Sequence, residues 1–500
     1  MLKDARRPLS VAIGVALLSI AWLFGNPPAA APDEPEHYIR AVSLGRGEIL
    51  GQLGATSPMA PQNHDQAVLL AQITRSVAVP AGLAAPDTWF CTVQDHTSSA
   101  QCLGDSKPPR GIGRQVTYVG SYQPYAYALA APLTRLAATP VTALYLARLG
   151  YLLIALPLLL LAVIVIHEPG SPATMLGVTL ALTPMVLFTS AAVSPSAVEV
   201  AGAICLWAAI VRLWRRPGDA ALAVVAIAIS VFAISISRPL GVLWVAFAAF
   251  STVVLLGQTG LGIAWQANRR GLVIAGLATL AGLIPNLAWQ LTVLPPTART
   301  LTATIAFLGP SILSIPETIG EAIGVFGWQD TLMPRPWYAV WGLLVVALIA
   351  AALTRGRRAE LRRLEAILLG VAFLMLLVPA VVLLPTGYAV QGRYLLPALS
   401  AVPLVAGEMV RRSEAGGASR STNLLMAAAA VGVGAVQFVA WYSNAHRYAV
   451  GLTGRWLFLA DAQWQPPLGW APWLMLALAG AVAMGAASTP TRPGRRAAEA

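Results

Sequence analysis

Residues 144–166 read LYLARLGYLLIALPLLLLAVIVI, an apolar run with one charged residue, Arg148. A run of this length can cross the hydrocarbon core of a bilayer as an α-helix. Similar runs recur along the 500-residue chain, which is 57% hydrophobic and has a mean hydropathy of +0.68. In lipid only helices and closed barrels satisfy the backbone, and barrel strands are shorter and alternate in polarity. The sequence therefore predicts an all-α polytopic membrane protein.

We expect about twelve transmembrane helices. They cover residues 9–24, 144–166, 172–190, 195–214, 219–237, 240–257, 271–291, 337–354, 364–384, 394–410, 423–442 and 470–488. Arginines gather in the loops that this arrangement places inside the cell, such as residues 355–363 and 411–420. Because positive residues favour the cytoplasmic side, the sequence predicts a multi-pass protein of the cell membrane with cytoplasmic N- and C-termini.

The predicted organisation has six parts. In chain order they are the first transmembrane helix (1–25), an extracytoplasmic loop with juxtamembrane helices (26–140), transmembrane helices two to seven (141–291), a second large extracytoplasmic loop (292–336), transmembrane helices eight to twelve (337–488) and a cytoplasmic tail (489–500). Residues 118–133 are aromatic but short for a span, so we expect one interfacial or re-entrant helix there. Residues 29–31 resemble a signal-peptide cleavage site, and cleavage there is the alternative to an uncleaved first helix.

The net charge of +12 at first suggests a nucleic-acid partner. We expect none, because the basic residues lie in short loops next to the spans, as membrane topology requires. The chain also lacks a Gly-rich phosphate loop followed by Lys and Ser or Thr, so an ATP-driven pump is not expected. The expected partners are membrane lipid and lipid-linked substrates.

Two of the three cysteines, Cys91 and Cys102, share the first extracytoplasmic loop. That compartment permits disulfides, so we expect these two residues to pair. Two free thiols are the alternative. The third cysteine, Cys205, lies in an apolar run.

An acidic cluster follows the first span, in the stretch Asp33-Glu34-Pro35-Glu36-His37-Tyr38. A carboxylate at the outer membrane face can act as a general base toward a hydroxyl group or hold a divalent cation. The same pattern also begins helices, with Pro near the first position and acids in the first turn. The two interpretations are compatible, because a helix N-terminus holds a carboxylate rigidly.

Two arginines lie at predicted outer ends of spans, Arg238 and Arg393, and Tyr394 follows the second. Arginine binds phosphate bidentately, so the pair suits a lipid phosphate or diphosphate. Contact with lipid headgroups is the alternative. Glu199 lies about one turn inside a span, where a carboxylate is functional by default and an ion pair is the alternative.

The second outer loop adds Trp328 and Asp330, an aromatic and an acid of the kind that often face sugars. A solvated loop aspartate is the alternative for Asp330. Three histidines, His37, His64 and His96, fall in the first loop, but their spacing is not that of a zinc site. We therefore predict no metal-ligand set. The residues do not identify a cofactor. Binding of a divalent cation at the acidic cluster is left open.

With these residues placed, the chain resembles a bacterial family of multipass proteins known as domain of unknown function 2142. Four local patterns carry the resemblance and lie in the expected order and topology. They are PDEPEHY (32–38), QPYAY (123–127), GWQDT (327–331) and QGRYLLP (391–397).

That family in turn looks like the C-type membrane glycosyltransferases, which use polyprenyl-phosphate sugars and carry an acidic motif in the first outer loop. The resemblance implies that Asp33 is the catalytic base, that Glu34 supports it and that Arg238 and Arg393 hold the donor phosphate. His37, Tyr38, Glu199, Trp328, Asp330 and Tyr394 are the further candidates for substrate binding. Family members tend to show Ser-Pro-Asp where this chain has Ser194-Pro195-Ser196. Glu199, one turn on, is the acid that could stand in.

The leading hypothesis is an inverting glycosyltransferase at the outer face of an actinobacterial-type membrane. It would move a sugar from a polyprenyl-phosphate donor to a glycan or protein acceptor of the cell envelope. A multipass transporter or flippase of lipid-linked glycans is the alternative, although we find no internal repeat of the kind that transporters show. A membrane ligase or polymerase for lipid-linked glycans, or a non-catalytic membrane partner, is also left open.

Overall fold

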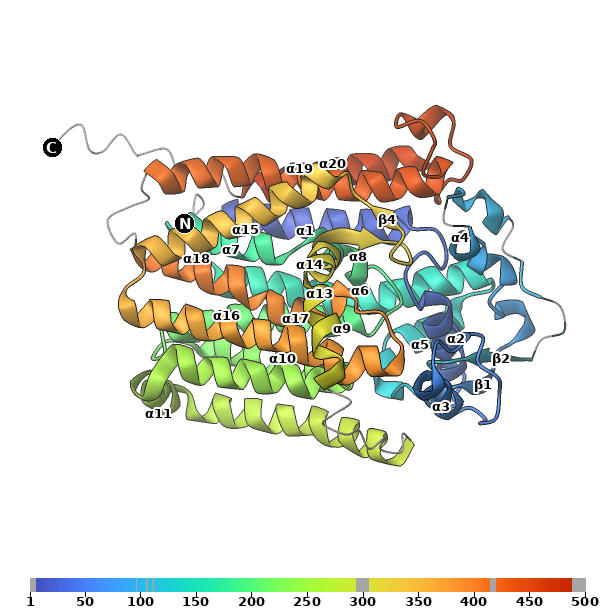
Figure 1. The fold of residues 1–500 in the computed structure, drawn as a ribbon, viewed down its shortest axis with the longest axis horizontal. Coiled ribbons are helices and arrows are strands. Elements are labelled where there is room, and N and C mark those ends of the chain that lie inside the picture. The colour runs from blue at the N-terminus through green and yellow to red at the C-terminus, as the bar shows by residue number, and fades with distance from the viewer. Residues whose placement is uncertain are drawn as a thin grey trace.

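The computed structural model describes residues 6–95, 97–104, 107–109, 111, 113–293, 305–413 and 420–487. The predicted tail at 489–500 and His96 lie outside these residues. Helices of 7 to 53 residues lie side by side and form the body of the molecule (Figure 1). They are α1 (Arg6–Gly25), α6 (Pro140–Ile166), α7 (Pro172–Ala181), α8 (Pro184–Ser190), α9 (Ser196–Arg215), α10 (Ala221–Ser237), α11 (Gly241–Val293), α15 (Arg335–Arg355), α16 (Arg358–Val378), α17 (Gly392–Leu399), α18 (Ala401–Ser413), α19 (Arg420–Val450) and α20 (Trp470–Ala486).

The remaining elements are short, and all but η6, η7 and η8 lie in the two predicted outer loops. After α1 come α2 (Glu34–Gly45), α3 (His64–Ile73), β1 (Arg75–Ala78), η1 (Ala81–Leu83), η2 (Asp87–Phe90), α4 (Cys91–Gln94), η3 (Ala100–Leu103), β2 (Arg114–Thr117), η4 (Pro124–Tyr127), α5 (Ala130–Leu133) and η5 (Thr134–Leu136). Later come α13 (Leu308–Leu313), α14 (Ile315–Gly324), β3 (Val325–Phe326), β4 (Thr331–Leu332), η6 (Pro379–Leu383), η7 (Leu384–Thr386) and η8 (Phe458–Ala460). Strands β1 and β2 pair antiparallel, as do β3 and β4.

An all-α polytopic membrane protein is therefore confirmed, and a helix or a helix pair lies at each predicted span. Among the described residues, seven helices are long and apolar enough to cross a membrane, or eight if α7 and α8, bent by 59°, form one broken span. Shorter apolar helices, α10 and α20 among them, occupy other predicted spans. Their length alone does not establish a crossing, so the number twelve stays a prediction, as do the domain boundaries and the orientation of the termini.

Prolines explain several helix boundaries. Helices α6, α7 and α8 each begin with proline at the first or second position, where the missing N–H costs nothing. Thr139 caps α6 by accepting a hydrogen bond from the Thr142 N–H at 3.2 Å. Pro184 follows the bend between α7 and α8, because a proline inside a helix would remove a backbone hydrogen bond.

Small residues let the long helices approach closely. A Cβ added to Gly177 of α7 would lie 2.6 Å from the Pro403 carbonyl of α18. A Cβ on Gly14 of α1 would lie 2.8 Å from the Gly480 carbonyl of α20. Close backbone contact through glycine is how transmembrane helices gain packing energy where lipid gives no hydrophobic drive.

The prediction of one helix over residues 118–133 is wrong. The segment instead forms two short helices, η4 and α5, and η5 follows them directly. Pro124 and Pro132 interrupt any longer helix, because each lacks a backbone N–H. Helices α2 to α5 and strands β1 and β2 gather at one end of the long bundle, on the right in Figure 1.

Candidate functional site

The acidic cluster begins at a tight backbone turn after α1. Asp33 occupies the N-cap position of α2 with φ 63°, in the left-handed region that Asp tolerates better than most residues. Pro35 follows within the first turn of the helix. The Asp33 side chain makes no capping hydrogen bond. Its carboxylate is therefore available for contacts with distant parts of the chain.

Two side chains hold the Asp33 carboxylate. The Tyr118 hydroxyl, directly after β2, donates to Oδ1 at 2.7 Å, and Nη2 of Arg393, in the first turn of α17, donates to Oδ2 at 2.8 Å. The Asp33 side chain remains 24% exposed. Burial alone would raise the pKa of Asp33, but the Arg393 charge and the Tyr118 hydrogen bond contribute to a net lowering. The carboxylate is thus ionised at neutral pH and accessible to a ligand.

The two predicted arginines contact the same tyrosine ring. The guanidinium carbon of Arg393 lies 5.2 Å from the centre of the Tyr394 ring, and that of Arg238 lies 4.7 Å from the same centre. Both distances are within the range of cation–π contact. The structure therefore brings together Asp33, Arg393, Tyr394 and Arg238, which the sequence spreads over most of its length.

Arg238 forms an ion pair with a different carboxylate, that of Glu199. It donates to Glu199 at 3.3 Å and to the Ser196 hydroxyl at 3.0 Å, both at the start of α9. Glu199 also accepts a hydrogen bond from Trp244 at 3.1 Å. Ser196 and Glu199, one turn apart, therefore contact the same arginine.

His37 lies one turn beyond Asp33 on α2. Its Nδ1 and the Tyr127 hydroxyl are 2.6 Å apart, and its ring meets the Tyr122 ring edge-on at 5.2 Å. Burial and, to a lesser degree, the two arginines lower the pKa of His37 to about 3, against the raising effect of Asp33. His37 is therefore neutral at physiological pH.

Glu34 and Tyr38, which belong to the same acidic stretch, bind parts of the protein away from Asp33. Both oxygens of Glu34 accept hydrogen bonds from Arg148 of α6, at 2.8 and 2.7 Å, and both side chains are buried. Arg148 also donates to the carbonyls of residues 23, 26 and 27, so this pair holds the turn before α2. Tyr38 donates to the Leu83 carbonyl at 2.7 Å and packs on Trp89. These contacts are structural.

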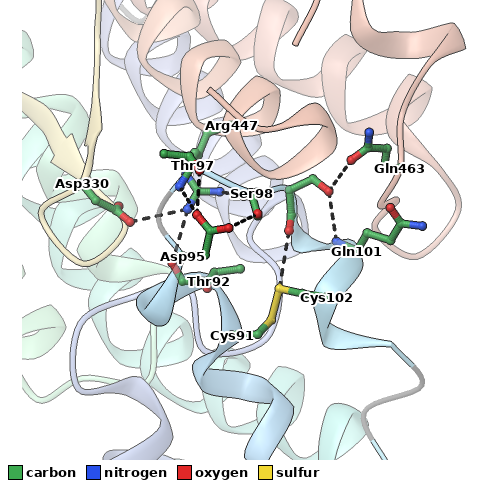
Figure 2. Close-up of a disulfide and its surroundings, with 11 residues drawn as sticks. Cys91, Thr92, Asp95, Thr97, Ser98, Gln101, Cys102, Asp330, Arg447 and Gln463 are labelled. Carbon is green, nitrogen blue, oxygen red and sulfur yellow. Dashed lines mark hydrogen bonds and ion pairs between the residues drawn. A yellow bond between two sulfur atoms is a disulfide. The ribbon is translucent and has the colours of Figure 1, made fainter. Parts of the chain in front are cut away.

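The hairpin of β3 and β4 places the two predicted site residues Trp328 and Asp330 in different surroundings. Trp328 donates to the Ala29 carbonyl at 3.0 Å, beside the turn that leads to Asp33. Asp330 lies 3.6 Å from Nη2 of Arg447 on α19, next to the disulfide segment (Figure 2). Asp330 therefore does not join the cluster around Asp33. Cys91 and Cys102 form a disulfide in the structure.

Sequence reasoning missed Tyr118 and Glu321. Glu321 of α14 accepts a hydrogen bond from the Gly392 N–H at 2.7 Å and another from Gln329 at 2.7 Å, so it fixes the start of the helix that carries Arg393. Tyr118 had a weak signal, as the first aromatic residue of a tyrosine-rich segment. Within the described part of the chain, no three His, Cys, Asp or Glu side chains gather closely enough to hold a metal ion.

The comparisons with known proteins place the chain in a family. A family model described as a predicted membrane protein, DUF2142, matches residues 16–402. The match covers all four local patterns and every residue of the cluster around Asp33. No curated protein matches the chain. Since the family model spans well over half of the sequence, the chain belongs to the family of predicted membrane proteins DUF2142.

Proposed function

We propose that this protein is a membrane glycosyltransferase, which transfers a sugar from a polyprenyl-phosphate donor to an acceptor hydroxyl of the cell envelope. One observation carries the proposal. An ionised and partly accessible carboxylate, Asp33, lies 2.8 Å from Arg393, and a second arginine, Arg238, contacts the same Tyr394 ring as Arg393. A base beside two phosphate-binding side chains is what this reaction requires.

The reaction needs one bond formed and one broken at the anomeric carbon. The acceptor oxygen attacks that carbon as its proton passes to Asp33, and the bond from the carbon to the phosphate oxygen breaks. The electron pair leaves with the polyprenyl phosphate, whose charge Arg393 and Arg238 stabilise. Attack opposite the leaving group inverts the anomeric configuration.

The ion pair between Asp33 and Arg393 gives donor binding a second effect. A phosphate at Arg393 would compete with the carboxylate for the guanidinium and place negative charge next to it. Both changes raise the pKa of Asp33, because the first weakens the attraction that lowers it in the free protein and the second adds repulsion between like charges. Donor binding would thus make Asp33 a stronger base at the point where the acceptor arrives.

The test is transfer of radiolabelled sugar from polyprenyl-phosphate donors in membranes containing the full chain. Asp33→Asn should lower transfer by roughly 10²- to 10⁴-fold. Asp87→Asn is the matched control, since Asp87 is an exposed aspartate of the same loop. Transfer that survives Asp33→Asn would overturn the assignment of the base. Absence of transfer with every donor and acceptor tested would instead favour the transporter or the non-catalytic reading.

A further inference from the structure

A second polar site lies beside the disulfide, away from the cluster around Asp33. The bond between Cys91 and Cys102 joins α4 to η3, with the two Cα atoms 5.9 Å apart. A cavity of about 500 Å³ lies next to it. One wall comes from residues 97–102 and the other from Val450, Thr453 and Gln463, which follow α19 or end it. The Ser99 hydroxyl donates to Oε1 of Gln463 at 2.6 Å, which joins the two walls, and Figure 2 shows Gln463 beside Gln101 and the disulfide.

The side chains that line the cavity suit a ligand rich in hydroxyl groups. They are mostly hydroxyls and primary amides, from Thr97, Ser98, Ser99, Gln101, Thr453 and Gln463, and none of the described lining residues is charged. Such groups both donate and accept hydrogen bonds, as sugar hydroxyls do. The volume falls within the range of small-ligand sites and would admit a few sugar units.

The charge at the rim disfavours an anionic ligand. Asp95 lies on the segment that leads into the cavity wall and is exposed. Its Oδ1 accepts hydrogen bonds from the Thr97 N–H at 3.0 Å and the Thr97 hydroxyl at 2.6 Å, and its Oδ2 accepts one from Ser98. The hydrogen bonds lower the pKa of Asp95, so its negative charge persists at any physiological pH. A phosphorylated or acidic sugar would meet that charge.

The walls are fixed before any ligand arrives. Arg447, which is fully buried, donates to the carbonyls of Ser98 and Thr92. The Leu452 N–H donates to the Thr97 carbonyl at 3.1 Å. At Gly451, with φ 77°, an added Cβ would lie only 2.5 Å from that same carbonyl. A rigid wall loses little entropy on binding, so weak individual contacts can still give measurable affinity.

The cavity is connected to the cluster around Asp33 by one hairpin. Asp330 pairs with Arg447 at 3.6 Å, and the preceding residue, Gln329, bonds to Gln391 at 3.1 Å, two positions before Arg393. The wall that contains Thr453 and Gln463 lies beyond residues 16–402, which the family model matches. The family match therefore covers only one wall of the cavity, residues 97–102.

We propose that this cavity binds an uncharged oligosaccharide. If the proposed glycosyltransferase function holds, the bound oligosaccharide is the acceptor glycan, and this second statement rests on that function. Binding itself does not require it. The two claims can fail separately, because the first is tested by affinity and the second by transfer.

The experiment measures binding of tritiated neutral di- and trisaccharides of glucose, galactose and mannose to the purified full-length protein in detergent. Gln463→Ala removes one wall amide and should weaken binding about tenfold, near the upper value of one lost hydrogen bond. Gln465→Ala, an exposed glutamine two residues on, is the matched control and should bind as the native protein does. The melting temperature of each variant shows whether it is folded.

Three outcomes would overturn the proposal. They are no binding of any neutral oligosaccharide by the native protein, equal binding by the Gln463→Ala variant, or tighter binding of a Ser- and Thr-rich peptide than of any sugar. The Asp33→Asn variant separates this site from the proposed reaction. Sugar binding retained in that variant together with lost transfer supports both proposals. Normal transfer in that variant, with sugar binding that depends on Gln463, keeps the cavity and the transfer activity and overturns only Asp33 as the base.

Discussion

Asp33 and Arg393 lie 360 positions apart in the sequence, yet their side chains are 2.8 Å apart. The bond joins the first helix after α1 to the first turn of α17. A buried or half-buried pair of this kind is weak evidence for stability, because desolvation offsets the attraction. The pair lies close to a second arginine, Arg238, and the Asp33 carboxylate is partly accessible. Both features favour the proposed functional role over a purely structural one.

The pH dependence of transfer tests that pair. Asp33 must be ionised to accept a proton, and Arg393 lowers its pKa, so transfer should decline only when the pH falls through this low value. Arg393→Gln removes the charge, raises the pKa of Asp33 and should move the acid limb of the pH–rate profile to higher pH. Arg455→Gln is the control, because the Arg455 side chain is 85% exposed. Identical acid limbs would show that Arg393 does not tune the base.

Tyr118 provides a second test of how Asp33 is held. Tyr118→Phe removes the hydroxyl that donates to Oδ1, so the carboxylate loses one of two anchors and is less well oriented. We expect transfer to fall about tenfold, as for the loss of one hydrogen bond to a charged group. Tyr125→Phe makes the same change at a buried hydroxyl that bonds to no other residue described in the structure, and it should have little effect. Equal losses in the two variants would contradict the role of Tyr118.

Glu34 should prove structural rather than catalytic. Glu34→Ala leaves Arg148 buried without its carboxylate, and breaking a buried pair costs about 3–5 kcal/mol of unfolding free energy. Thermal unfolding in detergent measures the loss. Asp461→Ala breaks the exposed pair with Arg455 and should cost about 1 kcal/mol or less. If Glu34→Ala kept full stability but lost transfer, the catalytic role implied by the family resemblance would be restored.

Much of the fold follows from local sequence. Hydropathy finds the helices because lipid selects long apolar segments, and the acidic stretch predicts a helix start because Pro35 and the acids suit one. The interruption of a continuous helix over residues 118–133 could also have been predicted, since Pro124 and Pro132 lie there.

The contacts of the site were less predictable. Glu34 finds Arg148 114 positions away, and no local pattern marks that pairing. A single charge within a span, as at Arg148, does signal a buried partner, but it leaves open which acid that is. Asp330 shows the same limit, since its hairpin lies beside the Asp33 turn while its own carboxylate faces Arg447.

Glu321 is expected to position Arg393. Glu321→Ala leaves the Gly392 N–H without its acceptor, which should loosen the first turn of α17 and raise KM for the donor more than it lowers kcat. Glu321→Gln keeps an acceptor oxygen and should restore most of the donor affinity. Glu317→Ala, at an exposed position one turn earlier on α14, is the control. A Gln variant as impaired as the Ala variant would argue against a role through the helix start.

Glu36 gives the protein a pH-dependent stability. Its side chain is buried and accepts the Tyr118 N–H at 3.2 Å, and burial raises the pKa of Glu36 from 4.5 to about 7. Between these two values the folded chain holds a proton that the unfolded chain releases. The free energy of unfolding from this group is therefore fully present below the lower value and is lost as the pH rises through about 7.

Glu36→Gln should remove this dependence, because the amide does not titrate and its oxygen can still accept the backbone hydrogen bond. The melting temperature of the native protein should decline between pH 5 and pH 8, roughly the interval over which the carboxyl loses its proton, and that of the variant should change less. Asp87→Asn, at an exposed aspartate, should follow the native curve. Parallel declines in the native and Glu36→Gln proteins would assign the pH dependence to other groups.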